Sequence, residues 1–229
     1  MVITPNTASE VIYPESDGQP MADNTKQFRW IVTIKENLEI SFAGHPDVFI
    51  AGDLFWYPVA GNPNIKQAPD TLVVFGRPKG DRGSYKQWEE DNIPPQVVFE
   101  ILSPGNKTKE MAKKLLFYQR YGVEEYYIYD PDDNELTGFI RSEDWFQEIN
   151  ELQEWISPRL GIRFELTPET LEISRSDGQK FLTPVEIDQL RLQERQQKEA
   201  ALQQLEQERQ KYQDLITRLQ EKGINPEEI

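Results

Sequence analysis

Two acidic residues, Asp70 and Glu100, lie at or within apolar segments, where charged side chains are uncommon. Glu100 lies between Phe99 and Ile101, within a run of apolar residues expected to form a strand that is buried on both faces. A carboxylate in such a strand costs several kcal/mol unless it is paired or bound to a metal. Asp70 follows Pro69 and begins the preceding apolar strand, so neighbouring strands would hold both carboxylates at one end of a sheet.

Paired carboxylates of this kind form a hard oxygen site that suits Mg²⁺ or Mn²⁺. The alternative is structural: Asp70 would initiate a turn, and an arginine would neutralise Glu100. The chemistry of these two residues alone leaves the two interpretations balanced.

Lys114 is the third candidate. At 100° per residue, Lys113 points to the opposite face of the expected helix, whereas one stripe holds Met111, Lys114, Leu115, Tyr118 and Tyr121. A lysine on this inward stripe could stand beside the two carboxylates, orient a water and offset charge at a scissile phosphate. The alternative is that its alkyl chain lies at the edge of the stripe and its amine reaches solvent.

Mixed α and β elements surround these candidates. Helical spacing of Phe28, Ile31, Ile34 and Leu38 predicts a helix over residues 24–39. A second helix is expected from about 107 to 121, ending at Gly122. A hairpin is expected around Asp177-Gly178, with arms at 171–175 and 180–182. The other predicted strands are 48–50, 71–75, 97–102, 125–129 and 135–140.

The chain divides by composition into a flexible segment at 1–22, a folded domain at 23–183, a helix at 184–222 and a tail at 223–229. Within the helix, alternating spacings of three and four residues join Leu202, Leu205, Arg209, Tyr212, Ile216 and Leu219. This seam predicts about three heptads of coiled coil and a homo-oligomer, specifically a dimer. The alternative is that the seam folds back on its own domain.

The composition excludes several classes of protein. The absence of Cys rules out disulfides and thiolate sites, and the single histidine, His45, rules out a His-rich zinc site. No apolar run approaches the ~20 residues that span a bilayer. The first 25 residues have neither a basic nor an apolar signal region, so a cytoplasmic protein without membrane contact is expected.

The net charge of −15 opposes non-specific binding to nucleic acid. Residues 77–121 differ, because they hold nine Lys or Arg against six Asp or Glu, a net charge of +3. The acidic surplus would therefore lie away from a substrate face.

Four separated segments resemble a known family. They are Pro69-Asp70, Glu100-Ile101-Leu102-Ser103-Pro104, Lys114-Leu115-Leu116-Phe117-Tyr118, and Gly122-Val123-Glu124-Glu125-Tyr126 with Asp130-Pro131. Over about residues 25–183 the sequence is similar to the bacterial putative restriction endonuclease family, a domain of unknown function placed in the PD-(D/E)XK nuclease superfamily. The resemblance implies an α/β (α+β) fold with an αβββαβ core, a mixed sheet and extra β-hairpins.

The resemblance also implies roles for particular residues. The two acids of the family fall on Asp70 and Glu100, which with the backbone carbonyl of Ile101 would hold Mg²⁺ or Mn²⁺. The lysine of the superfamily usually follows the acid by two residues, but Leu102 occupies that position here. The family is thought to have moved the amine to the following helix, which agrees with the stripe that contains Lys114.

Glu36 and Asp53 are weaker acidic candidates, in addition to Asp70, Glu100 and Lys114. The function implied is a divalent-metal-dependent endonuclease that hydrolyses phosphodiester bonds of nucleic acid, DNA in preference to RNA. The alternative is a catalytically silent nuclease-like module that binds a protein partner and oligomerises through its C-terminal helix. A buried cation beside two acids favours the enzyme, because a silent module does not need one.

Overall fold

The computed structural model describes residues 11–16, 18, 22–105 and 108–222. The predicted tail at 223–229, and most of the predicted flexible segment at 1–22, lie outside this range. The chain divides into two compact units, Met1–Phe181 and Leu182–Ile229.

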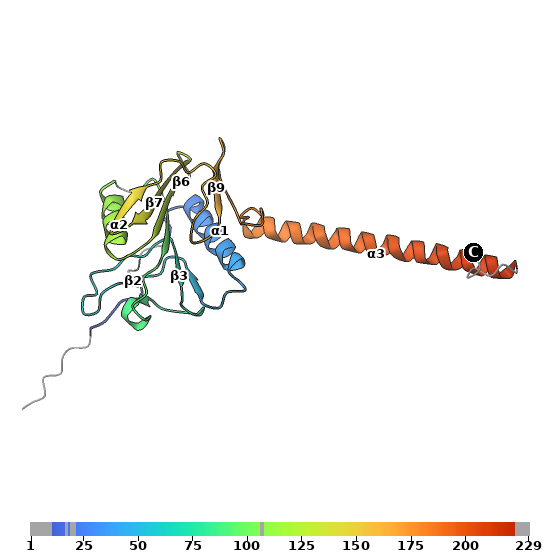
Figure 1. Cartoon of the computed structure of the whole chain (residues 1–229), viewed down its shortest axis with the longest axis horizontal. Helices are drawn as coiled ribbons and strands as arrows, with labels where there is room; N and C mark the ends of the chain where they lie inside the picture. Colours follow the sequence, from blue (N-terminus) through green and yellow to red (C-terminus); the bar gives the residue numbers. More distant parts are fainter. Residues whose placement is uncertain (1–10, 17, 19–21, 106–107, 223–229) are drawn as a thin grey trace, which may run out of the picture. The chain divides into compact units, whose positions relative to one another are not determined.

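A six-stranded mixed sheet forms the centre of the first unit (Figure 1). Its strand order is β1-β3-β5-β6-β7-β8, and only β5 and β6 run parallel to each other. The strands are β1 (Val48–Ala51), β3 (Thr71–Phe75), β5 (Val97–Ile101), β6 (Glu125–Asp130), β7 (Glu135–Ser142) and β8 (Trp145–Glu148).

Two helices lie on opposite sides of this sheet (Figure 1). They are α1 (Thr25–Ser41) and α2 (Thr108–Arg120). Asn24 is the N-cap of α1, and its side chain accepts hydrogen bonds from the backbone N–H groups of Lys26 and Gln27. Gly122 follows α2 with a φ of 95°, a conformation that glycine adopts without steric cost. The order α1, β1, β3, β5, α2, β6 confirms the αβββαβ core expected from the sequence.

Smaller elements complete the two hydrophobic layers. The antiparallel pair β9 (Arg163–Leu166) and β10 (Leu171–Ser174) packs on the same face as α1. The short parallel pair β2 (Trp56–Tyr57) and β4 (Tyr85–Lys86), followed by the 3₁₀ turn Gln87–Glu89, packs on the face of α2.

All five residues of β5 are buried, and they alternate between the two layers. Val97, Phe99 and Ile101 belong to the α1 layer, whereas Val98 belongs to the α2 layer. The period of two along a strand therefore directs Glu100 toward α2. The central strand of the fold carries its one acidic residue into the interior.

Two local details differ from what the sequence suggests. Phe28 of α1 is 48% exposed, and the inward position one residue earlier is occupied by Gln27 at 7%. The predicted hairpin arm at 180–182 is short, with a bridge between Lys180 and Ser174 and a hydrogen bond from the Phe181 N–H to the Ile173 carbonyl, and β10 also pairs with β9, a strand that the sequence did not indicate.

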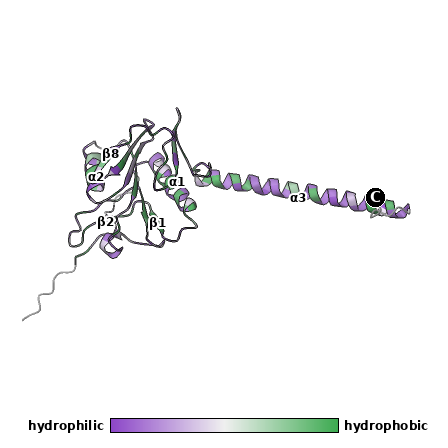
Figure 2. Ribbon diagram, in the orientation of Figure 1, coloured by the Kyte–Doolittle hydropathy of each residue, from purple (hydrophilic) through white to green (hydrophobic). Residues whose placement is uncertain are grey.

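The second unit consists mainly of one helix, α3 (Pro184–Glu221). Thr183 and Glu186 form a reciprocal capping box at its start, and Arg195 pairs with Glu199 one turn later. Apolar and polar residues alternate along α3 (Figure 2), and the side chains of Leu202 and Leu205 are more than half exposed. The coiled coil remains a prediction. None of the described helices is long and apolar enough to span a bilayer.

Candidate active site

Asp70 and Glu100 are neighbours across two strands. The antiparallel register of β3 and β5 sets Thr71 opposite Phe99, which brings the preceding Asp70 beside Glu100. Asp70 is 8% exposed and Glu100 is 2% exposed. The backbone N–H of Ile101 donates a 2.6 Å hydrogen bond to Oδ2 of Asp70, which fixes the orientation of this carboxylate.

Helix α2 supplies two partners to Glu100. The Lys114 Nζ atom lies 2.8 Å from Glu100 Oε2, and the Tyr118 hydroxyl donates to Oε1 at 2.5 Å. Only 13% of the Lys114 side chain is exposed, whereas Lys113 is exposed on the outer face. The helical period that predicted an inward Lys114 thus matches the structure. A lysine, and not the arginine of the structural alternative, pairs with Glu100.

Burial and neighbouring charges shift the pKa values of Asp70 and Lys114. Burial, followed by the nearby Glu100 carboxylate, holds the pKa of Asp70 well above its ordinary value. Burial alone would lower the pKa of Lys114, but the attraction of Glu100 outweighs it and the pKa is raised. Lys114 therefore stays protonated at neutral pH.

The carbonyl of Ile101, expected to be a metal ligand, already accepts one hydrogen bond. Its donor is the Gln27 side-chain amide of α1, at 2.8 Å. Gln27 is itself held by the backbone N–H of Asp23, and Asp23 accepts a 2.5 Å hydrogen bond from Ser103. A carbonyl oxygen has two lone pairs, so the contact with Gln27 orients this carbonyl and leaves capacity for a second partner.

A cavity of about 330 Å³ adjoins the site. Its lining includes Asp70 and Lys114 together with Asp53, whose charge contributes to the raised pKa of Asp70. The structure thus brings this secondary candidate to the site. It does not bring Glu36, which is half exposed, pairs with Lys35 and is not a lining residue. The other described lining residues are Ala22, Asp23, Gln27, Phe55, Lys66, Gln67, Ala68 and Glu110.

The donor set fits a hard divalent cation. No group of three or more His, Cys, Asp or Glu in the described ranges is arranged to hold a metal, so side chains alone do not form a complete site. Mg²⁺ typically takes one or two carboxylates and keeps several waters or phosphate oxygens. Asp70, Glu100 and the oriented Ile101 carbonyl match this requirement, and the mutual repulsion of the two buried acids is what a cation would relieve.

Three residues near the site were not recognised from the sequence as parts of it. Gln27 gives a weak signal, because it lies four residues before Ile31 on the inward stripe of α1. Tyr118 was placed on the inward stripe of α2, but nothing local indicates that its hydroxyl binds Glu100. Lys66 has no sequence signal, because a loop residue lacks the periodicity that identifies an inward face.

Comparisons with known proteins identify a family for this chain. The model of the Uma2 family, described as putative restriction endonuclease, matches residues 11–179. A solved structure of a putative nuclease from Anabaena variabilis has a TM-score of 0.45 and 16% identity, with 61% of this chain and 74% of that chain covered. Among curated proteins, none matches the chain. Because the family match spans most of the sequence, the chain belongs to the Uma2 family of putative restriction endonucleases.

Proposed function

We propose that this protein is a divalent-metal-dependent endonuclease that hydrolyses phosphodiester bonds of nucleic acid, with DNA as the substrate. The observation that carries the proposal is the buried pair of Asp70 and Glu100, with the Lys114 ammonium group 2.8 Å from Glu100 and a cavity beside them. Membership of a putative nuclease family supports the same chemistry.

Asp70, Glu100 and the Ile101 carbonyl would hold Mg²⁺ or Mn²⁺. Such an ion, when bound, supplies Lewis acidity and a water of lowered pKa. The protein's own groups then have distinct tasks. Lys114 would orient the attacking water and offset negative charge that develops on the phosphate. Tyr118 fixes one oxygen of Glu100, and Gln27 fixes the Ile101 carbonyl.

The distribution of charge along the sequence is compatible with a polyanionic substrate, although the chain as a whole is acidic. The segment from Arg77 to Tyr121, which contains β5 and α2, carries the net charge of +3. The acidic surplus of the chain therefore lies outside the segment that supplies Glu100 and Lys114. The cytoplasmic location expected from the sequence stays a prediction.

A silent nuclease-like module is the second candidate. It is favoured by the lack of a three-residue metal cluster in the described part of the chain and by the exposed leucines of α3. We propose self-association through α3, as a dimer, under either function, because packing two copies would bury that apolar seam.

The test is cleavage of supercoiled plasmid and of single-stranded DNA and RNA by the full chain, with Mg²⁺, with Mn²⁺ and with a chelator. Metal-dependent cleavage that disappears in Glu100→Ala would support the enzyme. Cleavage that persists in Glu100→Ala would assign the activity to a contaminant. A folded parent that cleaves none of these substrates would favour the silent module.

A further inference from the structure

Lys66 lies in the loop between β2 and β3 and lines the same cavity as Asp70 and Lys114. Its amine is 3.9 Å from the centre of the Phe55 ring and 5.7 Å from that of Tyr57. Within the described ranges, no carboxylate forms an ion pair with this amine. Lys114, the other lysine of the cavity, is by contrast engaged with Glu100.

The backbone holds Lys66 in place. The next residue, Gln67, exchanges two backbone hydrogen bonds with Trp56, of 2.7 and 3.2 Å, and Trp56 is fully buried. Phe55, the ring under the amine, is 8% exposed. The loop therefore presents the lysine from a fixed base, which reduces the entropy lost when the amine binds a ligand.

The contact with Phe55 leaves the amine able to bind. A cation over a ring face gains electrostatic attraction but uses none of its three hydrogen-bond donors in a conventional bond. Four carboxylates line the cavity, those of Asp23, Asp53, Asp70 and Glu110. An entering phosphate would be repelled by them, and Lys66 is the lining cation that is not already paired with an acid in the described part of the chain.

We propose that Lys66 binds a backbone phosphate of the nucleic-acid substrate within this cavity, an inference that rests on the proposed function. The cation holds the strand beside Asp70, Glu100 and Lys114 and takes no part in bond cleavage. The competing explanation is that Lys66 only covers the Phe55 ring, in which case its charge would matter for stability and not for binding.

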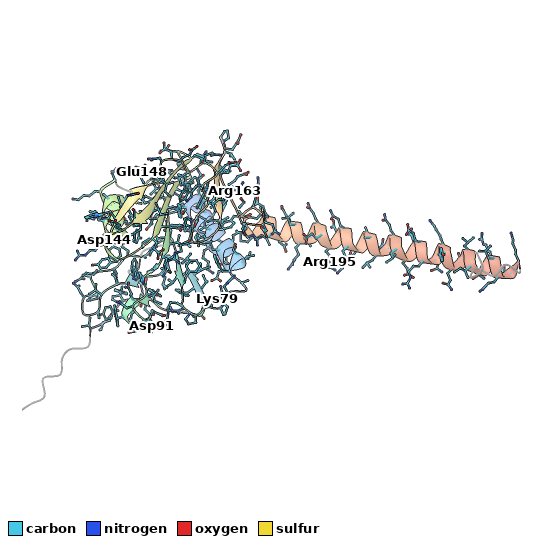
Figure 3. All side chains as sticks on the ribbon, in the orientation of Figure 1. Lys79, Asp91, Asp144, Glu148, Arg163 and Arg195 are labelled. Carbon is cyan, nitrogen blue, oxygen red and sulfur yellow. The ribbon has the colours of Figure 1, made fainter. Side chains whose placement is uncertain are left out.

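The experiment measures binding of a fluorescein-labelled DNA duplex to the full chain by fluorescence anisotropy, with Ca²⁺ in place of Mg²⁺ so that binding is read without cleavage. The variants are Lys66→Gln and Lys66→Arg. The matched control is Lys79→Gln (Lys79 is labelled in Figure 3), which removes the same charge from a lysine that pairs with Glu39 and does not line this cavity.

Losing one charged phosphate contact should weaken binding by about tenfold. Lys66→Gln should also reduce the slope of log affinity against log salt by about one. Lys66→Arg should bind within about threefold of the parent, and Lys79→Gln should match the parent. Equal affinities and slopes for Lys66→Gln and Lys79→Gln would overturn the proposal, as would a Lys66→Gln variant that loses thermal stability but not affinity.

Cleavage of the same duplex with Mn²⁺ separates this inference from the proposed function. A parent that binds through Lys66 but does not cleave would refute the endonuclease and support the phosphate contact. A parent that cleaves, with Lys66→Gln equal to it in affinity, would support the endonuclease and refute the contact. A parent that neither binds nor cleaves any nucleic acid would refute both.

Discussion

Replacement of Lys114 by methionine removes the ammonium group and keeps most of the side-chain volume. Its partner, Glu100, has only 3% of its side chain exposed, so the variant leaves a buried carboxylate without its cation. Breaking a buried ion pair on one side costs about 3–5 kcal/mol. Tyr118 continues to donate to Glu100, which favours the lower end of this range, about 3 kcal/mol.

A domain of this size loses about 2–4 °C of melting temperature per kcal/mol, so Lys114→Met should melt about 6–12 °C below the parent. Thermal unfolding followed by circular dichroism, with a chelator present, measures the loss. Lys113→Met is the matched control, and its exposed side chain predicts a change of at most about 0.5 kcal/mol. The Glu100→Gln change in the Lys114→Met background should restore most of the loss. Equal melting temperatures for Lys114→Met and Lys113→Met would refute the reasoning.

Three further predictions concern the metal, a second buried acid and α3. Calorimetry should detect Mn²⁺ binding to the parent and not to Asp70→Asn, and equal heats would refute the metal assignment. Burial raises the pKa of Glu125 above the ordinary 4.5. Deprotonation of Glu125 therefore costs more in the folded state than in the unfolded state, and the folding stability falls as pH rises from 4.5 through the raised pKa. Glu125→Gln should therefore gain melting temperature relative to the parent from pH 4.5 toward neutrality, and a difference that is constant with pH would contradict this. Light scattering should give a dimer for the full chain and a monomer for a chain that ends at Phe181; a monomeric full chain would exclude self-association through α3.

The placement of Glu100 and Lys114 was predictable because its signals are local. A carboxylate within a buried strand conflicts with its neighbours in sequence, which identified Glu100 before any contact was known. The 3.6-residue period of a helix then separated Lys114 from Lys113 without knowledge of the fold. The order of the core elements followed from similar local patterns of apolar residues and turns.

The remaining parts depend on contacts between distant residues. Gln27 and Phe28 both fit the helical spacing of α1, and hydrophobicity favoured Phe28. The structure buries Gln27 instead, because its amide binds the carbonyl of Ile101, 74 residues further along the chain. No window of local sequence contains both partners, so periodicity could not choose between the two faces.

Strand β9 was missed for a related reason. The Asp177-Gly178 turn is where the sequence suggested, with Gly178 at a φ of 82°. Strand β10 also pairs with β9, and this pairing places Phe164 and Ile173 in the core at 0% and 2% exposure. A turn motif identifies the partner within a hairpin but not a further strand that pairs with one of its arms.

The most direct test of the account compares the rates at which the parent, Lys114→Met and Lys113→Met nick supercoiled plasmid with Mn²⁺. The assay temperature lies well below the melting temperature of each variant, so that all three are folded. The account predicts metal-dependent nicking by the parent and by Lys113→Met, and a loss of at least about a hundredfold in Lys114→Met. Equal nicking by Lys114→Met and Lys113→Met, or no nicking by any of the three, would contradict an active centre built from Asp70, Glu100 and Lys114.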